Sequence, residues 1–429
     1  MNITILTVGT RGDVQPYLAL AKGLQTSGHT VTVATGTNFE AFVREQGVSY
    51  ASLRADYFDL MESPEGRAMK SGNPLRAMQS MKTVIFPLIR RLLDDAWIAA
   101  KDSDLIIYHP KALAGAHIAE KLNIPCLTAM SVPIMRATAD YPAPGVTNRN
   151  LGGMFNRLTY AIVGMAAAPF SGIIKSWREE VLGLPGKSKI VNGFKMYGRA
   201  LPTLYSYSQH VLPRPSDWDE SVHVTGYWFL DGETIWQPPT DLVDFLEAGA
   251  PPVYVGFGSM VNDDPARLTQ TVIEALRKSG QRGVIATGWG GLHEADLPDN
   301  IFRLKEAPHD WLFPRMGAVV HHGGAGTVAA GLRAGKPSLI VPFMVDQPFW
   351  GNRVYELGVG PAPIPQKRLT VDHLAESIRQ VATDGEMRQR TVALGEKIRA
   401  EDGVANAVQV VEQYLKVKGK AAPVAAGAA

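Results

Sequence analysis

The sequence predicts an α/β protein built from two doubly wound, Rossmann-like domains. Short apolar strands alternate with amphipathic helices in both halves of the chain, a pattern typical of parallel sheets covered by helices on both faces. Strands in each half end in glycine-rich turns, at the edge where such sheets bind ligands. A length of 429 residues exceeds one ordinary core, and 45% hydrophobic residues suffice to fill two.

The first half opens with a strand at residues 3–8 that ends in the turn at 9–12. We expect a helix next, because apolar residues recur at helical spacing. Further strands are expected at 31–34, 104–108 and 125–129, with a helix at 112–122. The apolar face of the first helix comprises Val14, Tyr17, Leu18, Ala21 and Leu24.

Residues 131–200 break this alternation, and they are rich in methionine, proline, glycine and aromatic residues. An insertion of this kind in a compact domain is more often functional than idle. Its longest apolar run, at 160–174, contains Gly164 and Pro169 and is shorter than the ~20 residues that a membrane span needs. We expect a buried or pocket-lining helix there, in preference to a membrane-surface segment.

The second half repeats the pattern of the first. A strand at 252–259 ends in glycines and a helix follows at 268–278. Alternating apolar segments predict the remaining strands, which are 284–286, 301–304, 318–321 and 338–341.

These elements divide the chain into an N-terminal domain at 1–212 and a C-terminal domain at 241–403. Four prolines mark residues 213–240 as the interdomain linker. A helix at 404–418 is expected to pack back on the N-terminal domain. The small apolar residues of 419–429 lack periodicity and predict a disordered tail.

The most informative motif covers residues 321–327, His-His-Gly-Gly-Ala-Gly-Thr, between a predicted strand and a predicted helix. Its small residues let a diphosphate approach the backbone, and the N-terminus of the helix attracts negative charge. About twenty residues on stand Asp346 and Gln347, a carboxylate and an amide suited to binding sugar hydroxyls. A phosphate site and a hydroxyl site on neighbouring strand ends indicate a nucleotide sugar.

Composition excludes other classes. The net charge of +2 comes from 43 basic and 41 acidic residues, which argues against nucleic acid as a partner. Cys126 is the sole cysteine, which fits a reducing cytoplasm and excludes a disulfide framework. The first residues read as a strand and not as a signal peptide. Asp263 and Asp264 precede a proline in a polar turn, which indicates a helix cap and no metal site.

Four motifs, at residues 9–17, 253–260, 288–292 and 321–327, resemble those of the family-1 glycosyltransferases with the two-domain GT-B fold. They are most similar to the sterol 3-beta-glucosyltransferases and to bacterial natural-product glycosyltransferases of the macrolide and glycopeptide type. The resemblance implies an inverting transfer of a hexose, with glucose from UDP-glucose as the leading donor. It implies an acceptor-binding N-terminal domain and a C-terminal domain that binds the nucleotide sugar across a cleft.

The chain departs from the plant enzymes of this family. It has Ala307, Pro308 and His309 where they carry a Trp and a Gln, and Ala330 where they carry a Glu for the ribose. Trp289 is our candidate for stacking on the base. Eukaryotic sterol glucosyltransferases often carry membrane-targeting domains ahead of the catalytic part. Because this chain begins at the catalytic strand, the resemblance implies a compact, soluble, bacterial version.

The resemblance assigns Asp13 as the general base that takes the proton of the acceptor hydroxyl. A carboxylate with a pKa near ~4 suffices if it accepts the proton late in the reaction and lies within hydrogen-bond reach. Alternatively, Asp13 only caps the helix that begins at Val14. His109, just after a strand, either orients and assists Asp13 or is structural.

The donor is expected to bind to the C-terminal domain. His322 and Thr327 are assigned to the diphosphate together with the backbone N–H groups of the glycine turn, so that no metal or other cofactor is needed. His321 either contributes or packs, because alternate residues of a strand face opposite ways. The predicted donor residues are Ser259, Trp289, His322, Gly324, Ala325, Gly326, Thr327, Asp346 and Gln347.

The acceptor is expected to lie against the first domain, on the apolar segment that starts at residue 130. A soft, adaptable surface favours a bulky hydrophobic alcohol such as a sterol, triterpenoid, polyketide or flavonoid. Each residue taken alone also fits an ordinary core. The predicted acceptor residues are Met130, Ile134, Met135, Phe155, Tyr160 and Phe170.

Two rival functions share these motifs. Residues 324–329 fit the G-x-G-x-x-A form of a dinucleotide-binding oxidoreductase, although Asp346 lies several residues beyond its strand. A nucleotide-sugar epimerase on the same scaffold is a closer rival, but it does not need the large apolar insertion. The sequence leaves open the oligomeric state, the acceptor, the hexose and the choice between UDP and dTDP, and it predicts peripheral membrane contact at most.

Overall fold

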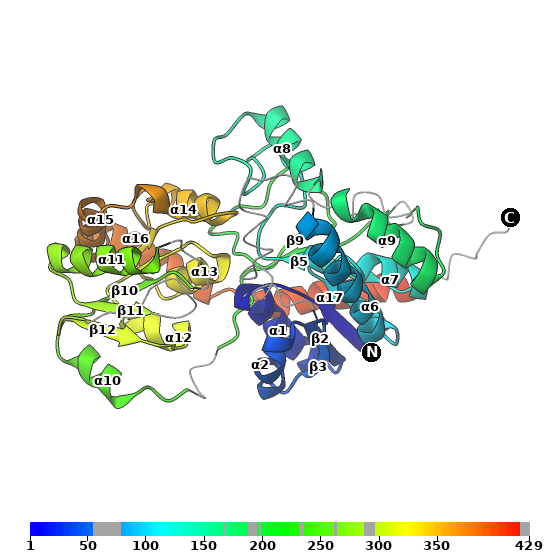
Figure 1. Cartoon of the computed structure of the whole chain (residues 1–429), viewed down its shortest axis with the longest axis horizontal. Coiled ribbons are helices and arrows are strands. Elements are labelled where there is room, and N and C mark those ends of the chain that lie inside the picture. The colour runs from blue at the N-terminus through cyan, green and yellow to red at the C-terminus, as the bar shows by residue number, and fades with distance from the viewer. Residues whose placement is uncertain are drawn as a thin grey trace.

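The structure is a computed structural model that describes residues 1–54, 79–165, 168–187, 195–196, 199–231, 236–258, 260, 264–286 and 297–420. These residues form two α/β domains, each with one fully parallel sheet (Figure 1). The predicted fold class is therefore confirmed.

The N-terminal sheet has the strand order β3-β2-β1-β4-β5-β8-β9. The order reverses between β1 and β4, so the chain segments that leave these two adjacent strands diverge and leave a binding position between them. The strands are β1 (Asn2–Leu6), β2 (Thr30–Thr35), β3 (Ser49–Ser52), β4 (Leu105–Tyr108), β5 (Cys126–Met130), β8 (Thr203–Tyr205) and β9 (Val222–Val224). The helices are α1 (Arg11–Thr26), α2 (Glu40–Glu45), α6 (Phe86–Ala100), α7 (Gly115–Leu122), α8 (Gly153–Met165) and α9 (Ser171–Trp177).

The C-terminal sheet has the order β12-β11-β10-β13-β14 and reverses between β10 and β13. Its strands are β10 (Val253–Gly256), β11 (Gly283–Ala286), β12 (Ile301–Leu304), β13 (Ala318–His321) and β14 (Ser338–Ile340). The remaining helices are α10 (Thr240–Glu247), α11 (Pro265–Ser279), α12 (His309–Leu312), α13 (Ala325–Arg333), α14 (Gln347–Glu356), α15 (Val371–Thr383), α16 (Gly385–Arg399) and α17 (Gly403–Lys420). A small antiparallel hairpin pairs β6 (Lys195–Met196) with β7 (Arg199–Ala200).

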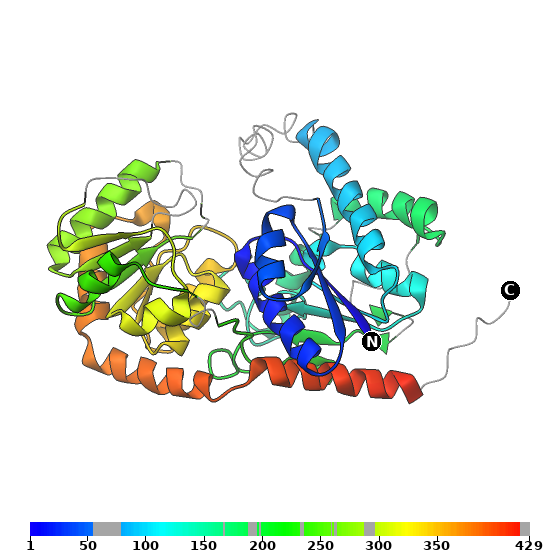
Figure 2. The ribbon, with the colours of Figure 1, turned by 90° about the horizontal axis from the view of Figure 1, so that it is seen from below.

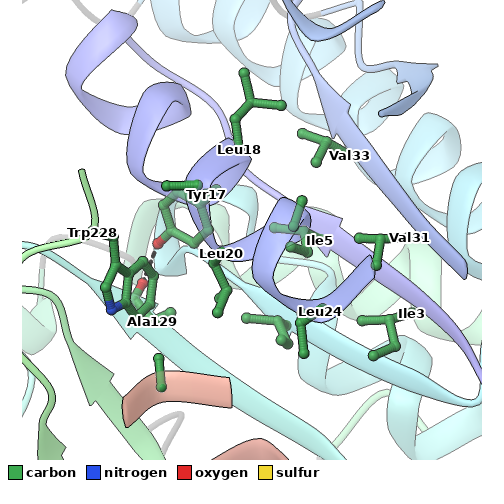
Figure 3. Close-up of a cluster of buried hydrophobic side chains, with 14 of the residues drawn as sticks. Ile3, Ile5, Tyr17, Leu18, Leu20, Leu24, Val31, Val33, Ala129 and Trp228 are labelled. Carbon is green, nitrogen blue, oxygen red and sulfur yellow. Dashed lines mark hydrogen bonds between the residues drawn. The ribbon is translucent and has the colours of Figure 1, made fainter. Parts of the chain in front are cut away.

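The first helix is held on the N-terminal sheet by the apolar face that the sequence predicts. Leu18 and Leu24 are fully buried against strand residues such as Ile5 (Figure 3). The hydroxyl of Tyr17 donates a hydrogen bond to the carbonyl oxygen of Ala129, and the ring of Trp228 lies edge-on to it. Because each buried leucine contributes ~1.5–3 kcal/mol, this face fixes the start of α1 rigidly above β1.

The domain boundaries differ in detail from the predicted ones. β9 lies inside the segment expected to be a linker and forms the edge of the N-terminal sheet. The last helix, α17, crosses under the N-terminal domain, and Ala407 and Val411 pack into the core around α1 (Figure 2). It ends at Lys420, so it includes two residues of the expected tail, and residues 421–429 lie outside the described residues.

The two domains contact each other through one apolar cluster with polar contacts beside it. The cluster joins Tyr207 of the first domain to Trp350 of the second, with ring centroids 6.2 Å apart. Arg353 donates a hydrogen bond to the carbonyl oxygen of Val211, and Arg333 pairs with Asp231. The junction therefore holds the ends of the two sheets near each other.

The apolar run at 160–174 was expected to form a buried or pocket-lining helix, and burial is wrong for its first part in α8, because only Tyr160 is buried among residues 160–165. The buried residues of α8 are Asn156, Thr159 and Tyr160, whereas five large apolar side chains are exposed: Met154, Phe155, Leu158, Ile162 and Met165. The physical reason is local: the Asn156 amide and the Thr159 hydroxyl bond to backbone of residues 139–151, so the polar side faces the protein. Figure 1 shows α8 projecting above the junction of the two domains.

Candidate active site

Asp13 lies in the first turn of α1, at the point where the N-terminal sheet reverses. The helix begins at Arg11 with Thr10 as its N-cap, three residues earlier than the sequence suggested. Asp13 Oδ2 accepts hydrogen bonds from Thr10 N at 2.9 Å and from Thr10 Oγ1 at 3.2 Å. A Cβ on Gly9 would lie 2.2 Å from Asp13 Oδ2, and Gly9 has a φ of 138°. Glycine is therefore required for the carboxylate to occupy this position.

Two further side chains, both from the segment after β4, reach Asp13. Lys111 Nζ lies 2.7 Å from Asp13 Oδ1, and His109 Nε2 lies 3.7 Å from the same oxygen. His109 Nδ1 accepts a hydrogen bond from Lys111 N at 3.0 Å, so the ring proton sits on Nε2, facing Asp13. The arrangement brings a carboxylate, an imidazole and an ammonium group to one position.

Electrostatics keep Asp13 ionised. Burial raises the pKa of its carboxyl group, but the charge of Lys111, with contributions from His109 and Thr10, outweighs burial and the net pKa is lowered. Burial and the neighbouring Lys111 lower the pKa of His109 to about 4. At neutral pH the group is therefore a carboxylate beside a neutral imidazole.

The glycine turn at 321–327 has the strand–turn–helix geometry that the sequence predicts. β13 ends at His321, Gly323 has a φ of 91°, and Gly324 is the N-cap of α13. The His322 ring is enclosed by glycines: a Cβ on Gly324 would lie 2.5 Å from its Nε2, and a Cβ on Gly258 would lie 3.0 Å from its Cε1. These glycines hold the ring beside the N-terminus of α13, where the N–H groups of the first turn lack partners within the helix.

The two adjacent histidines have different environments. His321 is fully buried, and its Nδ1 accepts a hydrogen bond from Gly323 N at 3.1 Å, so it supports the turn. His322 Nδ1 finds no hydrogen-bond partner among the described residues. Burial lowers the pKa of His322 to about 4, so its imidazole is neutral and can donate one N–H. Thr327 is half-buried in the first turn of α13.

Asp346 and Gln347 stand at the start of α14, but they differ in what they contact. Gln347 is buried, and its Oε1 accepts hydrogen bonds from Phe343 N at 2.8 Å and Met344 N at 3.1 Å. Asp346 Oδ2 accepts one from Trp350 Nε1 at 3.0 Å. The structure therefore uses Gln347 to shape the loop, and Asp346 retains acceptor sites. Val345, directly before Asp346, has a φ of 55°, a strained conformation for a β-branched residue.

Asp346 carries an unfavourable charge in the free protein. Burial raises its pKa to about 6, and the negative charge of Asp13 adds to the rise. Because Asp13 lies in the first domain and Asp346 in the second, this electrostatic interaction acts across the domain junction. Arg11 and His309 are coupled across the same junction, since burial and then Arg11 lower the pKa of His309 to about 4. Charge interactions thus connect the start of α1, which carries the predicted base, with residues of the C-terminal domain.

The structure brings some of the predicted acceptor residues together and separates others. Met130, Ile134 and Met135 join the apolar cluster at the domain junction. Tyr160 is buried on the inner side of α8, and Phe155 points outward from the same helix. Phe170 ends a short 3-10 turn before α9 and is half-buried.

Two predicted donor residues, Ser259 and Trp289, lie outside the described residues. His309, which stands where plant relatives differ, stacks on the ring of Phe313 with centroids 4.2 Å apart. Across the part of the chain that the structure describes, no three His, Cys, Asp or Glu residues gather as a metal site. Asp264 instead accepts a hydrogen bond from Arg267 N at 3.0 Å and caps α11.

Sequence reasoning missed Lys111. The signal was present, because Lys111 follows His109 by two residues after a strand adjacent to β1. In a parallel sheet the carboxyl ends of adjacent strands share an edge, so the residues after β1 and after β4 must meet.

Comparison with known families matches one domain model near each end of the chain. Residues 3–139 match the glycosyltransferase family 28 N-terminal domain. Residues 285–414 match the C-terminal domain described as erythromycin biosynthesis protein CIII-like. Each match contains one half of the site: Asp13 and His109 in the first, His322 and Asp346 in the second.

Curated relatives include the sterol 3-beta-glucosyltransferase of Neosartorya fischeri, 41% identical over 97% of this chain, and that of Leptosphaeria maculans, 39% identical over 97%. The chain spans 30% and 29% of the length of these two relatives. The predicted resemblance to the sterol branch is confirmed.

Solved structures of similar fold include the calicheamicin glycosyltransferase, with a TM-score of 0.71 at 22% identity over 98% of this chain and 99% of that one. The kitacinnamycin glycotransferase has a TM-score of 0.70 at 21% identity, covering 96% of this chain and 98% of that one. At these identities the likeness shows the fold, which is the predicted GT-B fold.

Proposed function

The chain joins a glycosyltransferase family 28 N-terminal domain to an erythromycin biosynthesis protein CIII-like C-terminal domain, and we propose that it transfers a hexose to a bulky hydrophobic alcohol. The leading donor is UDP-glucose and the leading acceptor is a sterol, with triterpenoids, polyketides and flavonoids as further acceptors. The observation that carries the proposal is the carboxylate of Asp13, held by Thr10 and Lys111 after β1, whose charge interacts with Asp346 in the domain that also holds the glycine-enclosed ring of His322.

Asp13 acts as the general base. The acceptor hydroxyl gives its proton to the carboxylate while its oxygen bonds to the anomeric carbon of the sugar, and the bond from that carbon to the diphosphate breaks. Attack from the side opposite the leaving group inverts the anomeric centre. Thr10 holds Asp13 Oδ2, so Oδ1, which Lys111 contacts in the free protein, is the oxygen offered to the acceptor.

His109 and Lys111 orient the carboxylate of Asp13 and favour its ionised form. The Nε2 proton of His109 faces Asp13 Oδ1 and becomes a hydrogen-bond donor if the carboxylate moves closer by less than 1 Å from the present 3.7 Å. Lys111 is about half exposed, so it can swing away when the acceptor arrives. Both keep the carboxylate ionised until it takes the proton.

The leaving diphosphate is stabilised without a metal in this proposal. Its charge is met by the backbone N–H groups of Gly324, Ala325 and Gly326, by the hydroxyl of Thr327 and by an N–H of the His322 ring, while Thr327 N donates to the carbonyl oxygen of Gly324. The absence of side chains at Gly324 and Gly326 lets the phosphates approach the backbone. Ser259 is proposed to add a hydroxyl donor, and Trp289 to stack on the base.

Asp346 is proposed to accept hydrogen bonds from sugar hydroxyls. Its raised pKa reflects burial of the carboxylate, whose side-chain donor is Trp350, and sugar hydroxyls would supply further donors. Gln347 supports it by fixing the loop at 343–346. The proposal therefore assigns the sugar hydroxyls to Asp346 and the support of the loop to Gln347, whereas the sequence suggested that both side chains hold the sugar.

The hydrophobic acceptor is proposed to lie beside Met130, Ile134 and Met135, because these side chains belong to the same domain as Asp13 and join the apolar cluster at the domain junction. The relatives named for sterol glucosylation support a sterol, and the structures named for natural-product transfer support the wider class. The single cysteine, Cys126, is buried as a free thiol, which supports a cytoplasmic location.

One reaction tests the proposal. The protein is incubated with UDP-glucose and either cholesterol, ergosterol or a flavonoid, and the products are identified by mass spectrometry. We expect a glycoside and an equal amount of free UDP, with a β-linkage by NMR. Isomerised sugar nucleotide without an acceptor would indicate an epimerase, and oxidation of NAD(P)H would indicate an oxidoreductase.

A further inference from the structure

The helix α8 is amphipathic, but its polar side faces the protein and an apolar side faces outward. Five large apolar side chains, here named the α8 stripe, are between 52% and 67% exposed. Four of them recur at spacings of three and four residues and so share one face of the helix. The α8 stripe comprises Met154, Phe155, Leu158, Ile162 and Met165.

The inner side of α8 is firmly anchored, so the outward stripe is a fixed feature of the fold. Asn156 donates to the carbonyl oxygen of Ala139 at 2.8 Å and accepts from Leu151 N at 3.0 Å. Thr159 Oγ1 accepts from Ala143 N at 2.7 Å. Rotating the helix to bury the stripe would break these bonds and leave buried polar groups unpaired.

The exposed charges on the segment that contains the stripe are basic. Positions 141–178 contain no Asp or Glu and four basic residues, of which Arg178 is buried in an ion pair with Glu120, and Asp140, Glu179 and Glu180 border this range. Arg149 and Lys175 are exposed, and Arg157 lies on α8 itself, where it pairs with Asp217 at 2.8 Å. An apolar helix face with basic flanks is the pattern of helices that lie in the surface of an anionic bilayer.

A helix with the length of α8 can lie on the surface of a membrane but cannot cross it. By length and composition alone the segment Gly153–Leu182 passes for a membrane span. However, α8 has 13 residues and measures about 20 Å, short of the ~30 Å of a hydrocarbon core. Further along, Trp177 is fully buried, and Arg178 forms a buried ion pair with Glu120 at 2.7 Å, so this part belongs to the N-terminal domain.

We propose that the α8 stripe docks the protein on anionic lipid bilayers. A second copy of the chain is the less favoured occupant, because a symmetric contact would bring Arg149, Arg157 and Lys175 of both copies together. The inner side of α8 packs on the loop that carries Tyr141, whose ring lies 5.6 Å from that of Phe349 at the domain junction. If the proposed function holds, docking therefore places the acceptor region beside the bilayer from which a sterol is taken.

Vesicle flotation tests the docking without any use of sugar transfer. The protein is mixed with phosphatidylcholine vesicles that contain or lack phosphatidylglycerol. The stripe variant carries Leu158→Gln and Ile162→Gln, and a matched control carries Ile98→Gln and Tyr355→Gln, which are exposed apolar residues elsewhere. All four sites are more than half exposed, so both variants are expected to keep the wild-type melting temperature.

We expect the wild type and the control to float with the anionic vesicles, and the stripe variant to need on the order of ten-fold more lipid or more. Arg149→Gln with Lys175→Gln is expected to weaken binding to anionic vesicles only. Wild-type protein that floats with neither kind of vesicle would overturn the proposal. A dimer in sedimentation velocity that the stripe variant abolishes, without vesicle binding, would assign the stripe to self-association instead. None of these measurements uses sugar transfer, so a failure of the proposed activity would not change their outcomes.

Discussion

Replacing Asp346 by asparagine is expected to stabilise the ligand-free protein at neutral pH while weakening its hold on the donor. The carboxylate is buried near Asp13, and its pKa is raised from 3.8 to about 6. A raised pKa means that the folded state disfavours the ionised form. Asparagine keeps an oxygen for the Trp350 hydrogen bond and removes the charge.

The size of the effect follows from the shift. About two pKa units at 1.36 kcal/mol each amount to about 3 kcal/mol, and partial exposure of the side chain reduces this to about 1–3 kcal/mol. Below the unfolded pKa of 3.8 both states are protonated and the variant gains nothing. As the pH rises from about 4 through 6 the wild type loses stability relative to the variant, and above 6 the difference is constant.

Thermal unfolding at several pH values measures this difference. For a domain the size of the C-terminal one, we expect the variant to melt about 2–4 °C higher per kcal/mol at pH 7.5 and at the same temperature near pH 4. Asp372→Asn, at a carboxylate 80% exposed on α15, is the control and should leave the melting temperature nearly unchanged at each pH. An Asp346→Asn protein that is no more stable at pH 7.5, or equally shifted in acid, would refute the reasoning. In the same protein, the KM for the sugar nucleotide should rise.

Three other changes probe separate parts of the molecule. Lys111→Met removes the charge that lowers the pKa of Asp13, so the acid limb of kcat/KM should move to higher pH by about one unit, whereas Lys111→Arg should restore it; an unmoved limb would contradict the pairing. Gly324→Ala places a methyl group 2.5 Å from His322 Nε2, so calorimetry should show UDP binding weakened by on the order of ten-fold, whereas Gly385→Ala, in open space, should bind normally. Arg178→Met leaves Glu120 buried without its partner and should cost about 3–5 kcal/mol in urea unfolding, most of it recovered when Glu120→Leu is added; a smaller loss in the single variant would argue against a desolvated pair.

Much of the fold could be predicted from the sequence, because parallel strands between helices are buried on both faces and appear as short apolar runs. The runs at 3–8, 104–108 and 318–321 were identified for this reason and correspond to β1, β4 and β13. β3 was missed: its sequence Ser-Tyr-Ala-Ser lies at the sheet edge and is only half-buried, so no apolar run marks it.

The insertion shows where periodicity misleads. An apolar run predicts burial when the protein supplies the partner, but α8 turns its polar residues inward because the loop at 139–151 offers hydrogen bonds to Asn156 and Thr159. Whether Asn156 and Thr159 meet this loop depends on the course of its backbone, and hydropathy alone does not predict that course.

The candidate site could be predicted in its motifs but not in its contacts. Asp13 was identified through the family resemblance, and His322 and Asp346 were identified by residue type and by their positions after predicted strands. The Lys111 contact required knowing that β4 lies beside β1, and the Gln347 contacts required the course of the loop at 343–346. Side-chain partners depend on tertiary distances of a few ångströms, which a single sequence does not encode locally.

Substituting Asp13 by asparagine tests the central claim most directly. Asparagine keeps the hydrogen bonds to Thr10 but accepts no proton, so transfer from UDP-glucose to a sterol should fall by about 10²–10⁴-fold. Calorimetric affinity for UDP should be unchanged, because the donor residues lie in the other domain. Full transfer activity in the Asp13→Asn protein would contradict the account, as would a parallel loss of UDP binding.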